Sequence, residues 1–146
     1  MLLADSNVWL ALALSKHAFH PIVRAWFARQ KPSQPVLFCR STQQSFLRLL
    51  TTSAVLAPYG IPPLSNKAAW SAYEGFLADK RIAWVEEPPG LEPHWKKLAG
   101  VAKSSPKLWM DAYLAAFAMA GGYRLVTTDK AFKHFKGLDS VVLSTP

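Results

Sequence analysis

The sequence predicts an α/β protein in which helices cover both faces of a central parallel sheet. Short apolar runs that suit buried strands alternate along the chain with longer segments whose apolar residues recur at helical spacing. Such alternation is typical of a parallel sheet that is covered on both sides. The chain has 146 residues and 51% of them are hydrophobic, so we expect one folded domain over residues 1–146.

The first elements follow from an apolar opening segment. Residues 2–4 form a short apolar run that ends at Asp5, which predicts a buried strand followed by a turn. Residues 8–14 contain neither Gly nor Pro and predict a helix. A second helix begins around Pro21, because proline suits a first helical turn, and ends before Pro32.

The middle of the chain repeats this order. Residues 36–39 predict a second buried strand, and Ser41 or Thr42 can cap the helix that follows it. The proline-rich stretch 58–63 predicts a loop. Ser65 is then expected to cap a helix that reaches residue 77.

The last elements surround an alanine-rich segment. Residues 81–85 predict a strand that ends at the break Glu86-Glu87-Pro88-Pro89-Gly90. Residues 109–120 predict a helix, stopped by Gly121-Gly122 in the C-terminal cap position. The remaining elements are a strand, a short helix and a last strand, at residues 124–127, 129–135 and 141–143.

Charge and cysteine content narrow the class of protein. Seventeen Lys and Arg against nine Asp and Glu give a net charge of +8, which favours polyanionic partners such as nucleic acid. Cys39 is the single cysteine, so the chain forms no internal disulfide and no cysteine-based zinc cluster, and we expect the reducing cytoplasm. The opening apolar segment is shorter than the roughly 20 residues that span a bilayer, so we expect no membrane association.

Two aspartates are expected at the carboxyl edge of the sheet, where open parallel sheets bind ligands. Asp5 ends the first strand and Asp129 closely follows the strand that ends at Thr127, whereas Asp111 lies near the start of the alanine-rich helix. Three carboxylates close together would repel one another without a cation, and oxygen ligands favour Mg²⁺ or Mn²⁺. Singly, each has another interpretation: Asp5 and Asp129 as helix caps, and Asp111 as a charge that suits a helix N-terminus.

Three stretches resemble one known family. They are LLADSNVWLAL, RSTQQSFLRLLT and LWMDAYLAAFAMAGGYRLVTTDKAF, which together reach from the first residues to beyond residue 130. In these stretches the chain is similar to the PIN-domain ribonucleases, and within them to the VapC toxins of bacterial toxin–antitoxin pairs. The resemblance implies a PIN-like three-layer α/β/α domain with a central parallel sheet. It also implies an RNA substrate, a VapB-like antitoxin as partner, and a homodimer.

The resemblance also implies roles for individual residues. It makes Asp5, Asp111 and Asp129 the acids that hold one or two divalent ions, Mg²⁺ or Mn²⁺, which activate water to cut an RNA phosphodiester bond. It makes Asn7 and Thr127 the polar neighbours that orient these carboxylates. The expected activity is therefore that of a metal-dependent endoribonuclease, the toxin component of a type II toxin–antitoxin system.

One position departs from the family pattern. Many relatives carry a glutamate just before the FLRLL stretch, where this chain has Gln43 and Gln44, of which Gln43 is the expected equivalent. An amide oxygen can ligate a metal but brings no negative charge and cannot act as a base. We therefore expect weaker metal binding, with a second ion entering only together with the RNA phosphate.

Basic residues near the acids are candidates for RNA contacts. These are Arg40, Arg48 and Lys130, which could offset phosphate charge. The alternative is that they are ordinary surface charges or counter-ions of the acidic pocket.

Two other functions remain open at this point. In one, the glutamine makes the chain a catalytically weakened PIN-like module that only binds RNA or a protein. In the other, Asp5 is a phosphate-accepting nucleophile, as in receiver domains or haloacid-dehalogenase-like phosphatases, although those phosphatases carry a second Asp where this chain has Asn7.

Overall fold

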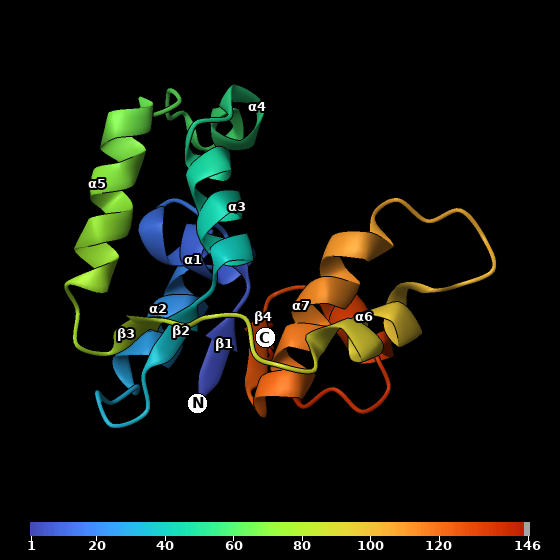
Figure 1. Cartoon of the computed structure of the whole chain (residues 1–146). Coiled ribbons are helices and arrows are strands. Elements are labelled where there is room, and N and C mark those ends of the chain that lie inside the picture. The colour runs from blue at the N-terminus through green and yellow to red at the C-terminus, as the bar shows by residue number, and fades with distance from the viewer. Residues whose placement is uncertain (145–146) are drawn as a thin grey trace.

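A five-stranded parallel sheet runs through the protein. The structure, a computed structural model, describes residues 1–144. The strands occur in the order β3-β2-β1-β4-β5, and every neighbouring pair is parallel (Figure 1). Their bounds are β1 (Leu2–Ala4), β2 (Val36–Phe38), β3 (Ile82–Trp84), β4 (Arg124–Thr127) and β5 (Ser140–Val142).

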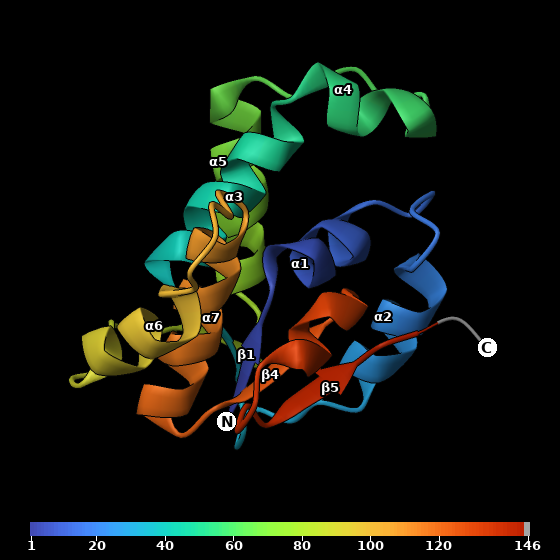
Figure 2. The same ribbon diagram turned by 90° about the vertical axis from the view of Figure 1, so that its right-hand side faces the viewer.

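Helices cover both faces of this sheet, as the sequence predicts (Figure 2). The elements that pack on one face are α1 (Ser6–Ala13), α2 (His20–Ala28), α3 (Arg40–Leu50), α4 (Ser53–Leu56) and α5 (Asn66–Leu77), with a 3₁₀ turn η1 (Ala57–Tyr59). The elements on the other face are α6 (Leu91–Ala99), α7 (Leu108–Gly121) and the 3₁₀ turn η2 (Lys130–His134).

Side-chain alternation along the strands produces these three layers. In β1, Leu3 belongs to the core under α7, whereas Ala4 belongs to the core under α1. Leu125 and Val126 divide in the same way in β4. Because successive strand residues point to opposite faces, one short apolar run supplies both cores. Both β1 and β4 are buried on each face, which accounts for runs that are continuously apolar.

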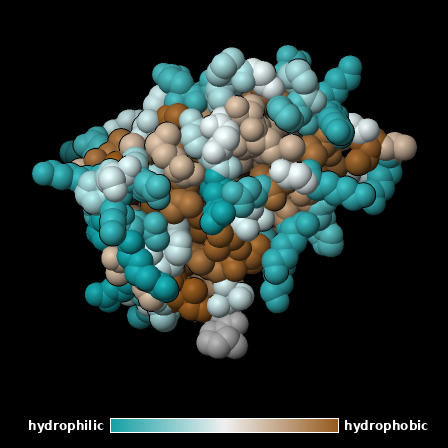
Figure 3. Space-filling model, turned by 90° about the horizontal axis from the view of Figure 1, so that it is seen from below, coloured by the Kyte–Doolittle hydropathy of each residue, from teal (hydrophilic) through white to brown (hydrophobic). Residues whose placement is uncertain are grey.

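The strand amino ends form the lower face of the molecule in Figure 1, and this face is shown in Figure 3. Hydrophilic side chains surround a central apolar area there. Within residues 1–144, no helix is both long enough and apolar enough to cross a membrane.

Several element boundaries differ from those expected. Helix α3 begins at Arg40 with Cys39 as its N-cap, so neither Ser41 nor Thr42 is the cap; instead the Thr42 hydroxyl accepts a hydrogen bond from the Cys39 N–H at 3.0 Å. The expected cap at Ser65 is confirmed, since its hydroxyl accepts from the Ala68 N–H at 3.1 Å. The short helix after β4 is a 3₁₀ turn, and part of the expected loop 58–63 is helical in η1.

Helix α6 has no counterpart in the sequence prediction. Its segment LEPHWKKLA carries Pro93, which breaks helices when it lies in their interior. Here the proline lies in the first turn, where its missing N–H costs nothing, and Gly90 precedes the helix with a φ of 79°. Helix α6 packs along α7 and completes the second face of the sheet.

Candidate active site

The candidate site lies where β1 and β4 end side by side. Ala4 is paired with Val126 in the register of the two strands, and the Asp5 N–H donates to the Val126 carbonyl at 2.9 Å. After β1 the chain continues to β2, which lies on one side of β1 in the sheet. After β4 it continues to β5, on the opposite side, so the loops that follow β1 and β4 diverge. Divergence of this kind creates the ligand-binding crevice of open parallel sheets.

The Thr127 side chain ties two of the candidate acids together. Its hydroxyl donates to Asp5 Oδ2 at 2.9 Å and accepts from the Asp129 N–H at 3.0 Å. Thr127 is fully buried, so its bond to Asp5 is shielded from water and correspondingly strong, while the bond from the Asp129 N–H is partly buried. The loop after β4 is therefore fixed relative to the Asp5 carboxylate.

Asp5 is a buried carboxylate whose side chain does not cap a helix. It is 7% exposed, and its second oxygen accepts from the Ser6 hydroxyl at 3.3 Å. Helix α1 instead begins on the Asp5 backbone carbonyl, which accepts from the Val8 N–H at 3.0 Å. Burial raises the pKa of Asp5, the hydrogen bonds from Thr127 and Ser6 oppose this, and Asp129 raises it further.

Asp111 faces the same site from the first turn of α7. A helix N-terminus favours a negative charge, which would lower the pKa of this carboxyl. The pKa of Asp111 is nevertheless raised, first by burial and then by the charges of Asp5 and Asp129. Burial and the charges of the other two carboxylates therefore outweigh the effect of the helix N-terminus on the pKa of Asp111. Asp5 and Asp129 lie close enough for their charges to act on Asp111.

Asp129 also serves as a helix cap. Its Oδ1 accepts from the Ala131 N–H at 2.9 Å at the start of η2. The capping interpretation is therefore correct for Asp129. The cap uses a single carboxylate oxygen, so it is compatible with a second role for the same residue.

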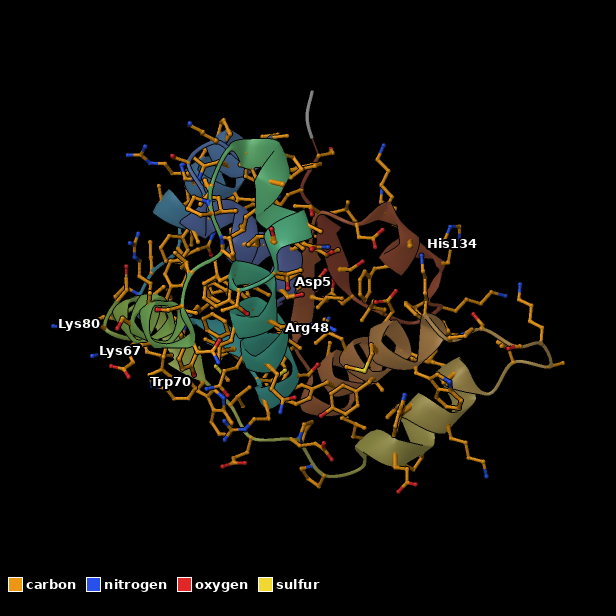
Figure 4. All side chains as sticks on the ribbon, turned by 90° about the horizontal axis from the view of Figure 1, so that it is seen from above. Asp5, Arg48, Lys67, Trp70, Lys80 and His134 are labelled. Carbon is orange, nitrogen blue, oxygen red and sulfur yellow. The ribbon has the colours of Figure 1, made fainter. Side chains whose placement is uncertain are left out.

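A small cleft of about 180 Å³ opens beside Asp5 and Asp111, and Asp129 is not among the residues that line it. Asp5 and Asp111 line it from β1 and α7, and Arg48 lines it from α3. Figure 4 shows Asp5 and Arg48 near the centre of this edge, with His134 and Trp70 toward opposite sides. The remaining lining residues are Ser6, Ser41, Thr42, Ser45, Met110 and Leu114.

The position of Gln43 differs from its expected place in the site. Its side chain is buried, and its Oε1 accepts a hydrogen bond from the Arg40 guanidinium, which lies 4.7 Å from the centre of the Trp84 ring. Neither Gln43 nor Arg40 lines the cleft. The α3 residues that line the cleft are Ser41, Thr42, Ser45 and Arg48, and of these only Arg48 was expected at the site from the sequence.

A pattern in the sequence could have identified Ser45. Ser41, Ser45 and Arg48 are spaced by four and three residues, so they occupy one face of a helix. Of the other expected positions, Asn7 is exposed in the first turn of α1 and Lys130 is exposed on η2 beside Asp129.

The chemistry of the donor set suits a hard divalent cation. Carboxylate and hydroxyl oxygens line the cleft, which matches the preference of Mg²⁺ and Mn²⁺. Within residues 1–144, however, no three Asp, Glu, His or Cys side chains are close enough together to enclose an ion. An ion bound here would keep water or substrate oxygens among its ligands, as Mg²⁺ commonly does in proteins.

The arrangement is less suited to a covalent role for Asp5. Both of its carboxylate oxygens accept hydrogen bonds, and the side chain is almost fully buried. A nucleophile must instead present one oxygen in line with the attacked phosphorus.

Comparisons with known proteins identify relatives of the whole chain. The PIN domain family model matches residues 2–138. Ribonuclease VapC41 of Mycobacterium tuberculosis (strain ATCC 25618 / H37Rv) is 52% identical over 145 residues, which cover 99% of each chain. Ribonuclease VapC31 of the same strain is 30% identical over 136 residues, which cover 92% of this chain and 93% of the relative.

Solved structures share the fold at low sequence identity. The DNA-bound VapBC complex from Salmonella typhimurium contains a chain with a TM-score of 0.68 and 16% identity, with 97% of each chain covered. VapC20 from Mycobacterium tuberculosis, described as a toxin that cleaves the sarcin-ricin loop, has a TM-score of 0.62 and 18% identity. That match covers 91% of this chain and 93% of VapC20.

Proposed function

This chain belongs to the PIN domain family, and we propose that it is a metal-dependent endoribonuclease that hydrolyses RNA phosphodiester bonds. The observation that carries this proposal is the Thr127 hydroxyl, which joins the Asp5 carboxylate to the loop of Asp129 opposite Asp111. Two full-length relatives named as ribonucleases support an RNA substrate. The net charge of +8 also suits a polyanion.

Asp5, Asp111 and Asp129 would share the divalent ion with water or substrate oxygens at the edge of the sheet. When it is bound, Mg²⁺ or Mn²⁺ supplies an activated water and charge stabilisation at the phosphate. Burial and mutual repulsion raise the pKa values of Asp5 and Asp111, so a cation relieves a real electrostatic cost. Thr127 and Ser6 hold the Asp5 carboxylate in one orientation by hydrogen bonds.

Basic residues near the acids would then position the RNA. Arg48 lines the cleft opposite the acids, so its guanidinium can contact the phosphate that approaches them. Lys130 is exposed next to Asp129 and supplies a second positive charge. Arg40 is bound to Gln43 and lies over Trp84, which directs it toward a different part of the surface.

A second candidate function rests on the α3 side of the cleft. Ser45, a neutral residue, faces the acids there, and Gln43 contributes no charge. Because α3 supplies no acidic side chain, metal binding would be weaker, which would favour the weakened module that binds RNA or a protein without cutting.

Cleavage by purified protein separates the two functions. We expect metal-dependent cleavage of RNA with Mg²⁺ or Mn²⁺, none in excess chelator, and none by Asp5→Asn or Asp111→Asn. Glu92→Gln, a change at an exposed position on α6, is the matched control and should cleave normally. RNA binding without cleavage across a range of both metals would instead support the module.

We further propose that the protein is the toxin of a type II toxin–antitoxin pair. This extension is supported by relatives of the VapC type and by solved neighbours that occur in VapBC complexes. Its partner would be a VapB-like antitoxin, and the toxin would form a homodimer in the reducing cytoplasm, with Cys39 kept as a buried thiol. Co-expression with its VapB-like antitoxin should suppress toxicity; unchanged growth arrest would contradict the pairing.

A further inference from the structure

A second cavity, of about 450 Å³, adjoins the acid cleft. Ser41 and Met110 line both, so the cavity and the cleft lie next to each other. It lies at the carboxyl ends of β2 and β3, between α3, α6 and α7. Its volume lies in the range of pockets that hold small organic ligands. We call it the aromatic pocket, after its lining by Trp84, Trp95 and Tyr113.

The rings of the aromatic pocket are fixed by their neighbours. Trp95 meets the Tyr113 ring edge-on at 5.6 Å, and its Nε1 donates to the Trp109 carbonyl at 3.0 Å. The Tyr113 hydroxyl donates to Glu87 Oε2 at 2.7 Å. Burial and Glu87 raise the pKa of Tyr113, so its hydroxyl remains protonated and keeps this bond at neutral pH. The pocket is thus ordered before any ligand arrives, which reduces the entropic cost of binding.

The charges of the pocket restrict what it can bind. Glu86 and Glu87 are exposed carboxylates in its lining, and they disfavour a phosphate. Arg40 lies over the Trp84 ring in the same lining and disfavours a cation. A flat, uncharged group with hydrogen-bonding edges fits both conditions, and it can stack on the Arg40 guanidinium that covers the Trp84 ring.

Among RNA components, a nucleobase meets this description, and the carboxylates select among the four bases. A carboxylate is an acceptor only, so it pairs best with two adjacent N–H donors. Guanine presents such a pair on its Watson–Crick edge, at N1 and the 2-amino group. Adenine and cytosine place a ring nitrogen acceptor next to their amino group, and uracil offers a single N–H between two carbonyl groups.

We propose that the aromatic pocket binds one unpaired guanine of the RNA, next to the phosphate that is cleaved between Asp5 and Asp111. This inference rests on the proposed nuclease function and adds a sequence preference to it. Single-stranded RNA is recognised in this way in general, by stacking and by hydrogen bonds to exposed base edges.

Nucleotide binding tests the pocket without any cleavage. The experiment titrates GMP, AMP, CMP and UMP into Asp5→Asn protein in chelator and follows the tryptophan indole N–H signals by NMR. GMP should shift the Trp84 and Trp95 signals at concentrations about tenfold lower than the other nucleotides, a difference that two hydrogen bonds can supply. Trp70, exposed on α5, is the internal control and should not shift. Equal binding of all four nucleotides, or no shift at Trp84 and Trp95, would overturn the proposal.

A carboxylate variant tests the base preference. Glu86→Gln combined with Glu87→Gln should remove the preference for GMP while the indole signals otherwise keep their positions. Both residues are exposed, so we expect the fold to be retained. The control Glu92→Gln should keep the preference.

Cleavage of an RNA pool with random sequence then links the pocket to the reaction. Wild-type protein should enrich guanine beside the cut, and the double variant should cut without that enrichment. Absence of any cleavage would contradict the proposed function and leave the GMP result to decide on the pocket. If the double variant kept its guanine preference and lost antitoxin binding, the pocket would belong to a protein partner and the proposal would fail.

Discussion

Replacing Thr127 with valine tests the link that orders the candidate site. Valine has nearly the same shape, so the change removes the hydroxyl and leaves the packing of this fully buried residue in place. The hydrogen bond to the Asp5 carboxylate is worth about 1.5–3 kcal/mol, and the Asp129 N–H loses its acceptor at a cost of about 1 kcal/mol or more. We therefore expect Thr127→Val to lower the free energy of unfolding by about 3 kcal/mol, or the Tm by roughly 6–12 °C.

The pH dependence identifies the carboxylate as the cause. The Thr127 hydroxyl stabilises the charged form of Asp5 and so lowers its pKa, against the larger effect of burial. Below the folded-state pKa of Asp5 the carboxyl is protonated and this stabilisation is absent; above it, the stabilisation is fully present. The loss in Thr127→Val should therefore be larger near ~pH 7 than near ~pH 4. The variant should also raise the pKa of Asp5 and shift the acidic limb of the cleavage rate to higher pH.

Urea unfolding at several pH values measures this, with two controls. Thr127→Ser keeps the hydroxyl and should lose about 1 kcal/mol of packing at every pH. Thr128→Val makes the same chemical change one residue further on, outside these hydrogen bonds, and should change stability by less than about 0.5 kcal/mol. If Thr127→Val matched Thr128→Val in stability and pH profile, the reasoning about this link would be refuted.

Other changes test the remaining parts of the account. Asp5→Asn should lower RNA cleavage by more than about 100-fold. It should also raise the Tm of the metal-free protein at neutral pH, measured by calorimetry, because the raised pKa of Asp5 shows that folding disfavours its charge. A lower Tm would contradict this explanation. Ser45→Glu should tighten Mn²⁺ binding in calorimetric titration by about tenfold, whereas Gln43→Glu should not; the reverse order would show that Gln43 reaches the ion. Gly121→Ala should lower the free energy of unfolding in urea by about 1–3 kcal/mol, because the added Cβ would lie 2.1 Å from the Tyr123 ring. Gly75→Ala should raise the free energy of unfolding by about 0.5–1 kcal/mol, because this helical position has open space around it.

The strands were the most predictable part of the fold. Leu2–Ala4 and Arg124–Thr127 coincide with the expected runs, because a strand that is buried on both faces must be continuously apolar. Helix boundaries that depend on a backbone cap were harder to predict from the sequence. Helix α3 begins at Arg40 although Ser41 and Thr42 are better capping residues, since the strand delivers the chain into the helix at Cys39.

Local patterns gave little indication of α6. Its segment carries Pro93, and its helical form depends on packing against α7, a contact that a local pattern does not contain. Pairing between distant segments is in general decided by tertiary structure and not by local preference.

The candidate site was predictable to the extent that it lies at strand ends. Asp5 and Thr127 end adjacent parallel strands, so their proximity follows from topology. The orientation of α3 residues was not predictable in this way. A rotation of about 100° per residue decides whether position 43 or 45 faces the acids, and the packing of α3 on α1 and α5 sets that rotation.

Mapping of RNA ends in cells tests the central claim most directly. The protein is induced briefly, total RNA is sequenced for newly formed ends, and Asp5→Ala serves as the inactive control. We expect growth arrest and new ends at a small number of positions with the wild-type chain, and neither with Asp5→Ala. Normal growth without new ends, or the same ends with both proteins, would contradict the assignment of a nuclease centre to Asp5, Asp111 and Asp129.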